Sequence, residues 1–109
     1  MHGFRVSFFT QQGRTHGMLS ISEWLLKEAK ALGIKGATVT VAQGGYGRDG
    51  KYHAAHFFEI AEQPMEVHMA VRPEECERLF ARIEAEKLEI FFMKIPVEFG
   101  VTGKKDEAD

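Results

Sequence analysis

Residues 44–52 hold the side chains best suited to bind a ligand. The segment reads Gly-Gly-Tyr-Gly-Arg-Asp-Gly-Lys-Tyr, a mixture that does not fit a regular helix or strand. Glycine lets the backbone adopt positive φ values and lets a ligand approach closely, and successive backbone N–H groups in such a turn form a concavity that suits anions. Arg48 and Lys51 add charged donors for phosphate or carboxylate. The segment therefore predicts an anion-binding loop, with an ordinary hairpin loop as the alternative.

Two histidines near this loop offer a different chemistry. His53 and His56 lie three residues apart and would share a metal ion if the segment turned, whereas in an extended strand they would point to opposite faces. Two imidazoles do not complete a coordination sphere, so His16, Glu59 or a neighbouring subunit would have to contribute. Surface histidines without a metal are the alternative.

The rest of the sequence offers no diagnostic catalytic group. No nucleophile and base stand at a characteristic spacing, and no pair of carboxylates stands alone in an apolar segment. Cys76 is the only cysteine, so the chain has no internal disulfide and no thiolate metal cluster. On the apolar stripe of a predicted helix, Cys76 is expected to be buried and inert.

Length and composition indicate one globular domain, which we place at residues 1–100, followed by a polar tail at 101–109. The 109 residues are 44% hydrophobic and 28% charged, and the net charge of -2 argues against a nucleic-acid partner. The sequence shows no signal peptide and no apolar run of membrane-spanning length. We therefore expect a cytoplasmic protein.

Hydrophobic periodicity places a strand, a helix and a second strand before the glycine-rich loop. Apolar residues alternate with polar ones over residues 4–8, as expected of a strand with one face on a core. Ser20 and Glu23 have the spacing of a capping box, and the helix is predicted to begin a little earlier, near Met18. It should end at Gly33, because glycine favours the left-handed position that ends a helix. The β-branched residues at 37–42 predict the second strand.

The second half repeats this order. Residues 56–60 are predicted to form a short strand or the returning arm of the loop, and residues 65–71 give the clearest alternation in the sequence. His68, in this strand, is predicted to be a hydrogen-bonded packing residue. A helix begins at Pro73, and the last strand is predicted over residues 88–93, extending to 95. Pro96 places the end of that strand at a sheet edge or in a turn.

The predicted order is β-α-β, loop, β-α-β, which indicates an α+β, ferredoxin-like split βαβ fold with an antiparallel sheet and both helices on one face. The opposite face would carry a mixture of polar and apolar side chains, so we expect it to contact other subunits. Its predicted members are Arg5, Ser7, Phe9, Thr38, Thr40, Glu66, His68 and Ala70.

Several separate motifs, in the right order, resemble the PII signalling proteins, and in particular the PII-like domain-of-unknown-function family 190. They comprise the Gly-Ala-Thr-Val and Gly-Tyr-Gly segments with a following histidine, here His53, together with the strand, helix start and tail that come after the loop. The matching residues are 36–41, 45–51, 63–71, 73–75, 90–93, 96–98 and 102–103.

The resemblance implies a homotrimer that binds adenine nucleotides in clefts between subunits and docks its loop, the T-loop, onto protein or membrane-transporter partners without catalysing a reaction. It also implies magnesium binding near Asp49, although family members usually have glutamine there, which puts 2-oxoglutarate binding in doubt. The glycine-rich phosphate loop after the second helix is replaced by an acidic segment. The residues expected to bind a small anionic ligand are Gly45, Tyr46, Gly47, Arg48, Asp49, Lys51, Lys104 and Lys105.

The sequence thus favours a cytosolic PII-like regulator that binds a small anion, with an adenine nucleotide as the expected ligand. One alternative is a metal-binding trimer of the same fold that uses His53 and His56. The other is a small ferredoxin-like enzyme, which would need an enclosed apolar pocket with a perturbed acid or base.

Overall fold

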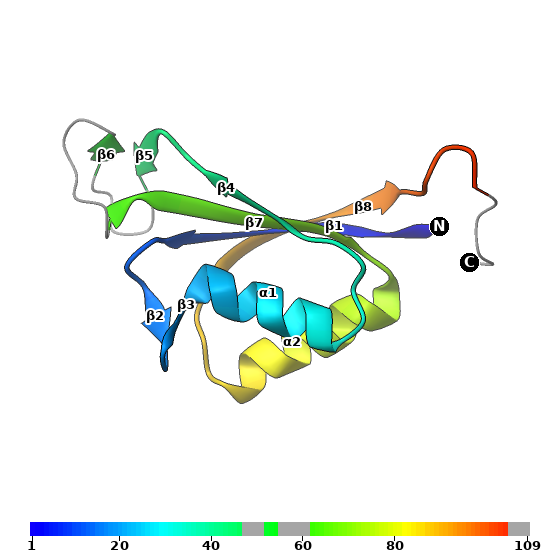
Figure 1. Cartoon of the computed structure of the whole chain (residues 1–109), viewed down its shortest axis with the longest axis horizontal. Helices are drawn as coiled ribbons and strands as arrows, with labels where there is room; N and C mark the ends of the chain where they lie inside the picture. The colour runs from blue at the N-terminus through cyan, green and yellow to red at the C-terminus, as the bar shows by residue number, and fades with distance from the viewer. Residues whose placement is uncertain (47–51, 55–61, 105–109) are drawn as a thin grey trace.

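The computed structural model describes residues 1–46, 52–54 and 62–104, with the backbone alone for 52–54. Two helices pack on one side of an antiparallel sheet (Figure 1). Neither described helix is long and apolar enough to cross a membrane. The elements are β1 (His2–Gln11), β2 (Thr15–His16), β3 (Leu19–Ser20), α1 (Ile21–Ala31), β4 (Thr38–Val41), β5 (Gly44–Tyr46), β6 (Tyr52–Ala54), β7 (Pro64–Val71), α2 (Pro73–Ala85) and β8 (Phe91–Glu98).

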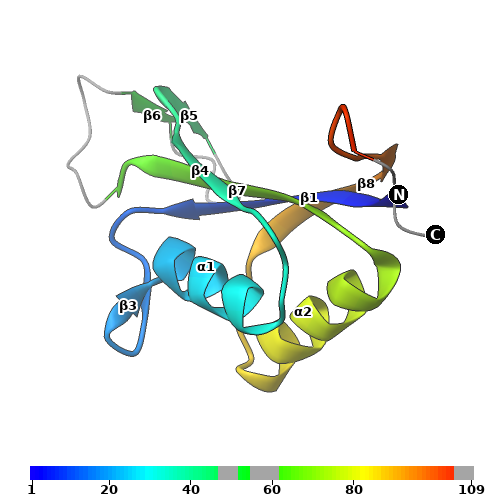
Figure 2. The ribbon, with the colours of Figure 1, turned by 45° about the vertical axis from the view of Figure 1, so that its right-hand side comes forward.

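The main sheet has four strands in the order β4-β7-β1-β8, and all its neighbouring pairs are antiparallel. The two central strands, β1 and β7, are joined to the edge strands through the crossovers that contain α1 and α2. Figure 2, turned by 45°, again shows both helices on the same side of the sheet. The predicted α+β, ferredoxin-like fold is confirmed, including the single face that the helices cover.

The core lies between this face and the helices because the strands alternate as the sequence predicted. Val6 and Phe8 on β1 and Val67 on β7 are almost completely buried, and they meet Leu25 of α1 and Leu79 of α2. Each fully buried aliphatic or aromatic side chain of this size contributes about 1.5–3 kcal/mol relative to an exposed one. Burial of this face fixes the strand register, since a shift by one residue would turn the apolar side chains to solvent.

Helix α1 has the predicted capping box but begins later than predicted. The hydroxyl of Ser20 accepts from the backbone N–H of Glu23 at 3.2 Å, and the Glu23 carboxylate accepts from the backbone N–H of Ser20 at 3.4 Å. The residues from 15 to 20 instead form the β2–β3 hairpin, whose turn includes Gly17 at φ 62° and the exposed Met18. The helix ends as expected, with Gly33 at φ 82°.

The last strand differs from its predicted bounds at both ends. The first residues of the predicted strand belong instead to the turn that ends α2. In this turn Lys87 takes φ 55° and the N–H of Leu88 donates to the carbonyl of Ile83 at 3.2 Å. Strand β8 therefore starts at Phe91, and it continues through Pro96 to Glu98. Since β8 is an edge strand of the sheet that the described residues form, proline can occupy it without removing a central hydrogen bond.

The sheet face opposite the helices, here called the open face, carries more apolar surface than the sequence indicated. The β1–β8 register places Phe91 beside Phe9, Met93 beside Ser7, and Ile95 beside Arg5. Phe91, Met93 and Ile95 are each about half exposed in the single chain. The open face thus presents an apolar strip along β8, at the edge of the sheet opposite β4 and next to β1.

Candidate functional site

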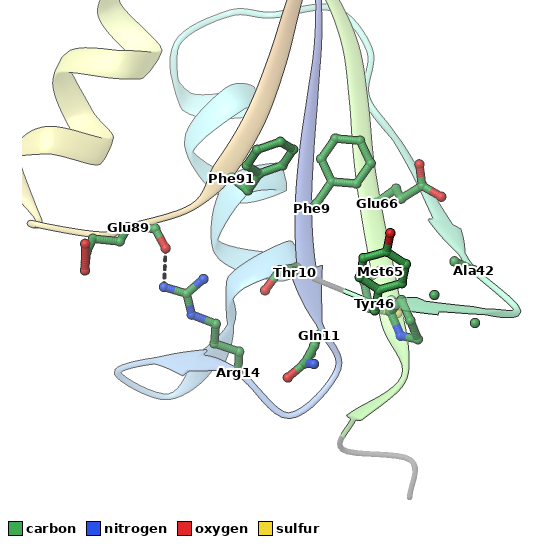
Figure 3. A pocket seen from close by; sticks show the side chains of 13 residues that line it. Phe9, Thr10, Gln11, Arg14, Ala42, Tyr46, Met65, Glu66, Glu89 and Phe91 are labelled. Carbon is green, nitrogen blue, oxygen red and sulfur yellow. Dashed lines mark hydrogen bonds between the residues drawn. The ribbon is translucent and has the colours of Figure 1, made fainter. Parts of the chain in front are cut away.

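A cavity of about 1010 Å³ lies at one end of the sheet, where β1 ends and β7 and β8 begin. The β5 strand forms its outer wall, and Arg14 and Glu89 stand at the opposite wall (Figure 3). Ligand pockets in proteins typically occupy about 300–1,000 Å³. The cavity therefore has the size expected of a small-molecule site, and its walls come from segments far apart in the sequence.

Backbone pairing beyond the regular strands holds these walls in place. The N–H of Ala42 donates to the carbonyl of Pro64 at 2.9 Å, and the N–H of Gln12 donates to the carbonyl of Gln63 at 2.9 Å. The first bond extends the β4–β7 ladder by one residue in the direction of β5. The second bond holds the loop that follows β1 against the start of β7. The end of the sheet is thus a fixed frame from which β5 extends.

The glycine-rich segment begins as a strand, contrary to the expectation that no regular element would accommodate it. Gly44, Gly45 and Tyr46 form β5 and pair with β6, with Gly45 opposite His53. Gly45 has φ 152°, a value that residues with a side chain rarely adopt. This pairing closes a β-hairpin whose base, at Gly44 and Gly45, lines the cavity.

Aromatic rings border the cavity on two sides. Tyr46 lines it from β5 and is 76% exposed, so its ring offers a flat surface to a ligand. Phe9 and Phe91 line it from the open face, with ring centroids 5.6 Å apart and planes inclined at 55°. Such rings favour a ligand with a planar apolar part, such as a nucleobase.

The charged groups around the cavity are one cation and two carboxylates among the described residues. Arg14 points across towards β8, and its guanidinium donates to the backbone carbonyl of Glu89. Glu66 and Glu89 are the acidic residues of the lining, and Figure 3 shows the Glu89 carboxylate turned away from Arg14. A ligand with several negative charges would therefore need additional cations here, and a divalent metal ion held through a carboxylate is one source.

The predicted ligand residues fall into three groups: those at the cavity, one in a turn beyond β8, and those outside the described part of the chain. Gly45 and Tyr46 line the cavity. Lys104 lies in a turn beyond β8, where its N–H donates to the carbonyl of Val101 at 3.2 Å. The remaining predicted residues fall outside the described part of the chain: Gly47, Arg48, Asp49, Lys51 and Lys105.

Lys104 is not brought to the cavity within one chain. Strand β8 starts at the cavity with Phe91 and runs away from it, and Phe99 then pairs with Met1 through two backbone hydrogen bonds of 2.8 Å. Figure 1 shows the segment after β8 beside the N-terminus, at the end of the molecule opposite β5. A role for Lys104 at this cavity would therefore require a second subunit.

The predicted histidine metal site cannot be assembled from the described side chains. His53 is placed only by its backbone in β6, and both His56 and Glu59 lie outside the described residues. The third predicted contributor, His16, is on β2, with its Nε2 atom 3.7 Å from a carboxylate oxygen of Glu86. In the parts of the chain that the structure describes, no group of three metal-binding side chains comes together.

His68 is the hydrogen-bonded packing residue that the sequence predicted. Its Nδ1 atom lies 2.9 Å from the hydroxyl of Ser7, and its Nε2 atom lies 3.3 Å from the hydroxyl of Thr40. The carboxylate of Glu66 is 3.5 Å from the same Nε2 atom. His68 thus ties together the three neighbouring strands β1, β4 and β7 on the open face.

Most residues that line the cavity were not predicted as ligand residues from the sequence, and three of them carry polar groups from distant segments. Thr10, Arg14 and Glu89 belong to the end of β1, the loop that follows and the segment before β8. Arg14 and Glu89 are 75 positions apart, so no motif spacing could have linked them. Only the antiparallel pairing of β1 with β8 brings the two segments together.

Comparison with known proteins supports the same fold. The chain matches 88% of its length to 89% of a PII-like signaling protein from Thermus thermophilus, with 20% identity and a TM-score of 0.60. It matches 92% of its length to 97% of CPII from Thiomonas intermedia, with 17% identity and a TM-score of 0.65. That nitrogen regulatory PII-like protein was solved with ADP, AMP and bicarbonate bound.

A third structure of the same fold is the periplasmic divalent cation tolerance protein CutA from Archaeoglobus fulgidus. Its match has 15% identity and a TM-score of 0.57, and covers 94% of this chain and 89% of that one. None of the curated proteins matches the chain in sequence. The model of the DUF190 family, described as "Uncharacterized ACR", matches residues 3–97. The chain therefore belongs to the DUF190 family and has the fold of the PII-like signalling proteins.

Proposed function

We propose that this protein is a PII-like regulator that binds an adenine nucleotide in the cavity beside β5. The observation that carries the proposal is the position of the cavity, which is lined by the first residues of the glycine-rich segment, in β5. A ligand there contacts Gly45 and Tyr46 directly, so binding and the conformation of the segment after Tyr46 are coupled. CPII, a protein of the same fold, provides the precedent for ADP and AMP.

The nucleobase would lie against the aromatic border and the phosphates would lie towards the glycine-rich segment. Tyr46 supplies an exposed ring for stacking, and Arg48 and Lys51 follow it closely in the sequence. Because the described lining has two acidic residues and one cation, we expect that Mg²⁺ held by an acidic side chain would offset the charge of the phosphates. Asp49 is a further candidate ligand for that ion.

We also propose that the functional assembly is a homotrimer joined through the open face. The apolar strip of Phe91, Met93 and Ile95 would be costly to leave in water. Within one chain Lys104 lies far from the cavity. A subunit placed on the open face would allow Lys104 of one chain to approach the cavity of another. Ligand binding would change the loop that a protein or transporter partner recognises, provided that the ligand prefers one loop state.

The test is calorimetric titration of the purified protein with ADP, AMP and ATP, with and without Mg²⁺. We expect at least one adenine nucleotide to bind and to raise the melting temperature by mass action. Tyr46→Ala should weaken binding about tenfold, since stacking on an aromatic ring is worth about 1–3 kcal/mol. Tyr46→Phe is the matched control and should bind like the wild type. Absence of binding by all three nucleotides would refute the proposed ligand.

A further inference from the structure

An unpartnered hydroxyl inside the cavity points to a second binding feature. Thr10 is 8% exposed and belongs to the residues that line the cavity, and its buried Oγ1 atom has no hydrogen-bond partner among the described residues. Buried hydroxyl groups are almost always hydrogen-bonded, because an unsatisfied one loses its bonds to water without replacement. The position of Thr10 at the cavity wall indicates that a ligand supplies the missing partner.

Arg14 provides a charge in the wall of the same cavity. Its backbone is held at both ends, since its N–H donates to the carbonyl of Gln11 at 3.1 Å and its carbonyl accepts from the N–H of Ile21 at 2.9 Å. The guanidinium has five N–H donors, and the one partner that the described residues give it is the neutral backbone carbonyl of Glu89. The charge of Arg14 is therefore not neutralised by this contact.

Figure 3 shows the Thr10 hydroxyl on the side of β1 that faces Arg14 and Glu89. We propose that Thr10 and Arg14 form a subsite for an oxyanion group, which replaces the Glu89 carbonyl on the Arg14 guanidinium and accepts a hydrogen bond from the Thr10 hydroxyl. This inference rests on the proposed use of the cavity as a ligand site. A planar guanidinium suits phosphate, carboxylate and bicarbonate alike, because it can donate two parallel bonds to two oxygens.

The exchange has a clear energetic direction. A hydrogen bond from a guanidinium to an oxyanion is stronger than one to a neutral carbonyl, and the ligand would also satisfy a hydroxyl that has no partner without it. The Glu89 carbonyl, in turn, lies in the segment between α2 and β8 and can turn to solvent. The same chemistry is offered by a nucleotide phosphate and by a free small oxyanion, so the experiment must separate the two sources.

The experiment compares Thr10→Val, Thr10→Ser and Arg14→Ala with the wild type in calorimetric titrations of ADP, adenosine, inorganic phosphate and bicarbonate. Two surface controls of matched type, Thr15→Val on β2 and Arg78→Ala on α2, remove similar groups from residues that do not line the cavity. If the subsite holds the nucleotide phosphate, Arg14→Ala weakens ADP binding tenfold or more and Thr10→Val about three- to tenfold. Adenosine binding should not change, and Thr10→Ser should keep most of the affinity.

If the subsite instead holds a free oxyanion, the same variants lose phosphate or bicarbonate binding while ADP binding stays at the wild-type level. A measurement without ligand separates binding from folding, because Thr10→Val removes an unsatisfied hydroxyl and should leave the melting temperature unchanged or higher. A clear drop in that temperature would overturn the inference, as would unchanged binding of ADP, phosphate and bicarbonate in both Thr10→Val and Arg14→Ala.

Titrations of the wild-type protein distinguish failure of the proposed function from failure of the subsite. If the wild type binds no adenine nucleotide, the proposed function fails, while the phosphate and bicarbonate titrations still decide whether the subsite exists. If the wild type binds ADP and none of the Thr10 and Arg14 variants alters binding of any probe, the proposed function stands and the subsite is wrong.

Discussion

The hydroxyl of Ser7 on β1 lies 2.9 Å from the Nδ1 atom of His68 on β7, across the centre of the open face. Ser7 is buried even in the single chain, and His68 is mostly covered by its neighbours. Polar cross-strand pairs of this kind stabilise the pairing of neighbouring strands.

We predict that the Ser7–His68 contact contributes to stability as a coupled pair. In a double-mutant cycle of Ser7→Ala and His68→Ala, the coupling free energy should be about 0.5–1.5 kcal/mol, the usual net value of a hydrogen bond. Urea denaturation of the four proteins measures it. Strictly additive effects of the two substitutions would show that the contact contributes nothing.

Assembly through the open face can be tested with a charge placed on it. Light scattering should give three times the chain mass of 12.3 kDa for the wild type. Met93→Glu should dissociate the trimer, because it would bury a carboxylate among apolar side chains. Met18→Glu, at the almost fully exposed tip of the β2–β3 hairpin, is the control and should remain trimeric. A monomeric wild type at micromolar concentration would contradict the model of assembly.

The part of the glycine-rich segment that follows Tyr46 should contribute to nucleotide binding through both its charge and its backbone. Arg48→Ala is expected to weaken ADP binding by about 1.5–3 kcal/mol, the scale of a charged hydrogen bond. Gly47→Val should weaken binding through the backbone and leave the helices folded, which circular dichroism would show. If both variants bind ADP as tightly as the wild type, the segment after Tyr46 is not part of the site.

Cys76 should react slowly in the folded protein. Burial raises the pKa of its thiol, and the nearby Lys94 charge opposes this only in part. Because the thiolate is the reactive form, a disulfide reagent at neutral pH should label the native protein far more slowly than the urea-unfolded one. Equal rates in the two states would mean that Cys76 is accessible, contrary to its 3% exposure.

Local features of the sequence were enough to determine the fold. The alternation in β1 and β7 selected the buried face, because successive side chains of a strand point to opposite sides. The capping box at Ser20 and the proline at 73 located the helices, since these signals act within one turn of helix. The order of the elements then left few possible topologies.

Features that depend on contacts between distant segments were decided only by the tertiary structure. Leu88, predicted as the start of the last strand, belongs to the turn that ends α2. Pairing with β1 extends β8 beyond Pro96. The same pairing set Arg14 against Glu89 and left the Thr10 hydroxyl unpartnered in the cavity. It also took Lys104 to the far end of the sheet. Sequence spacing cannot encode such placements, because they follow from the register between strands that are remote in the chain.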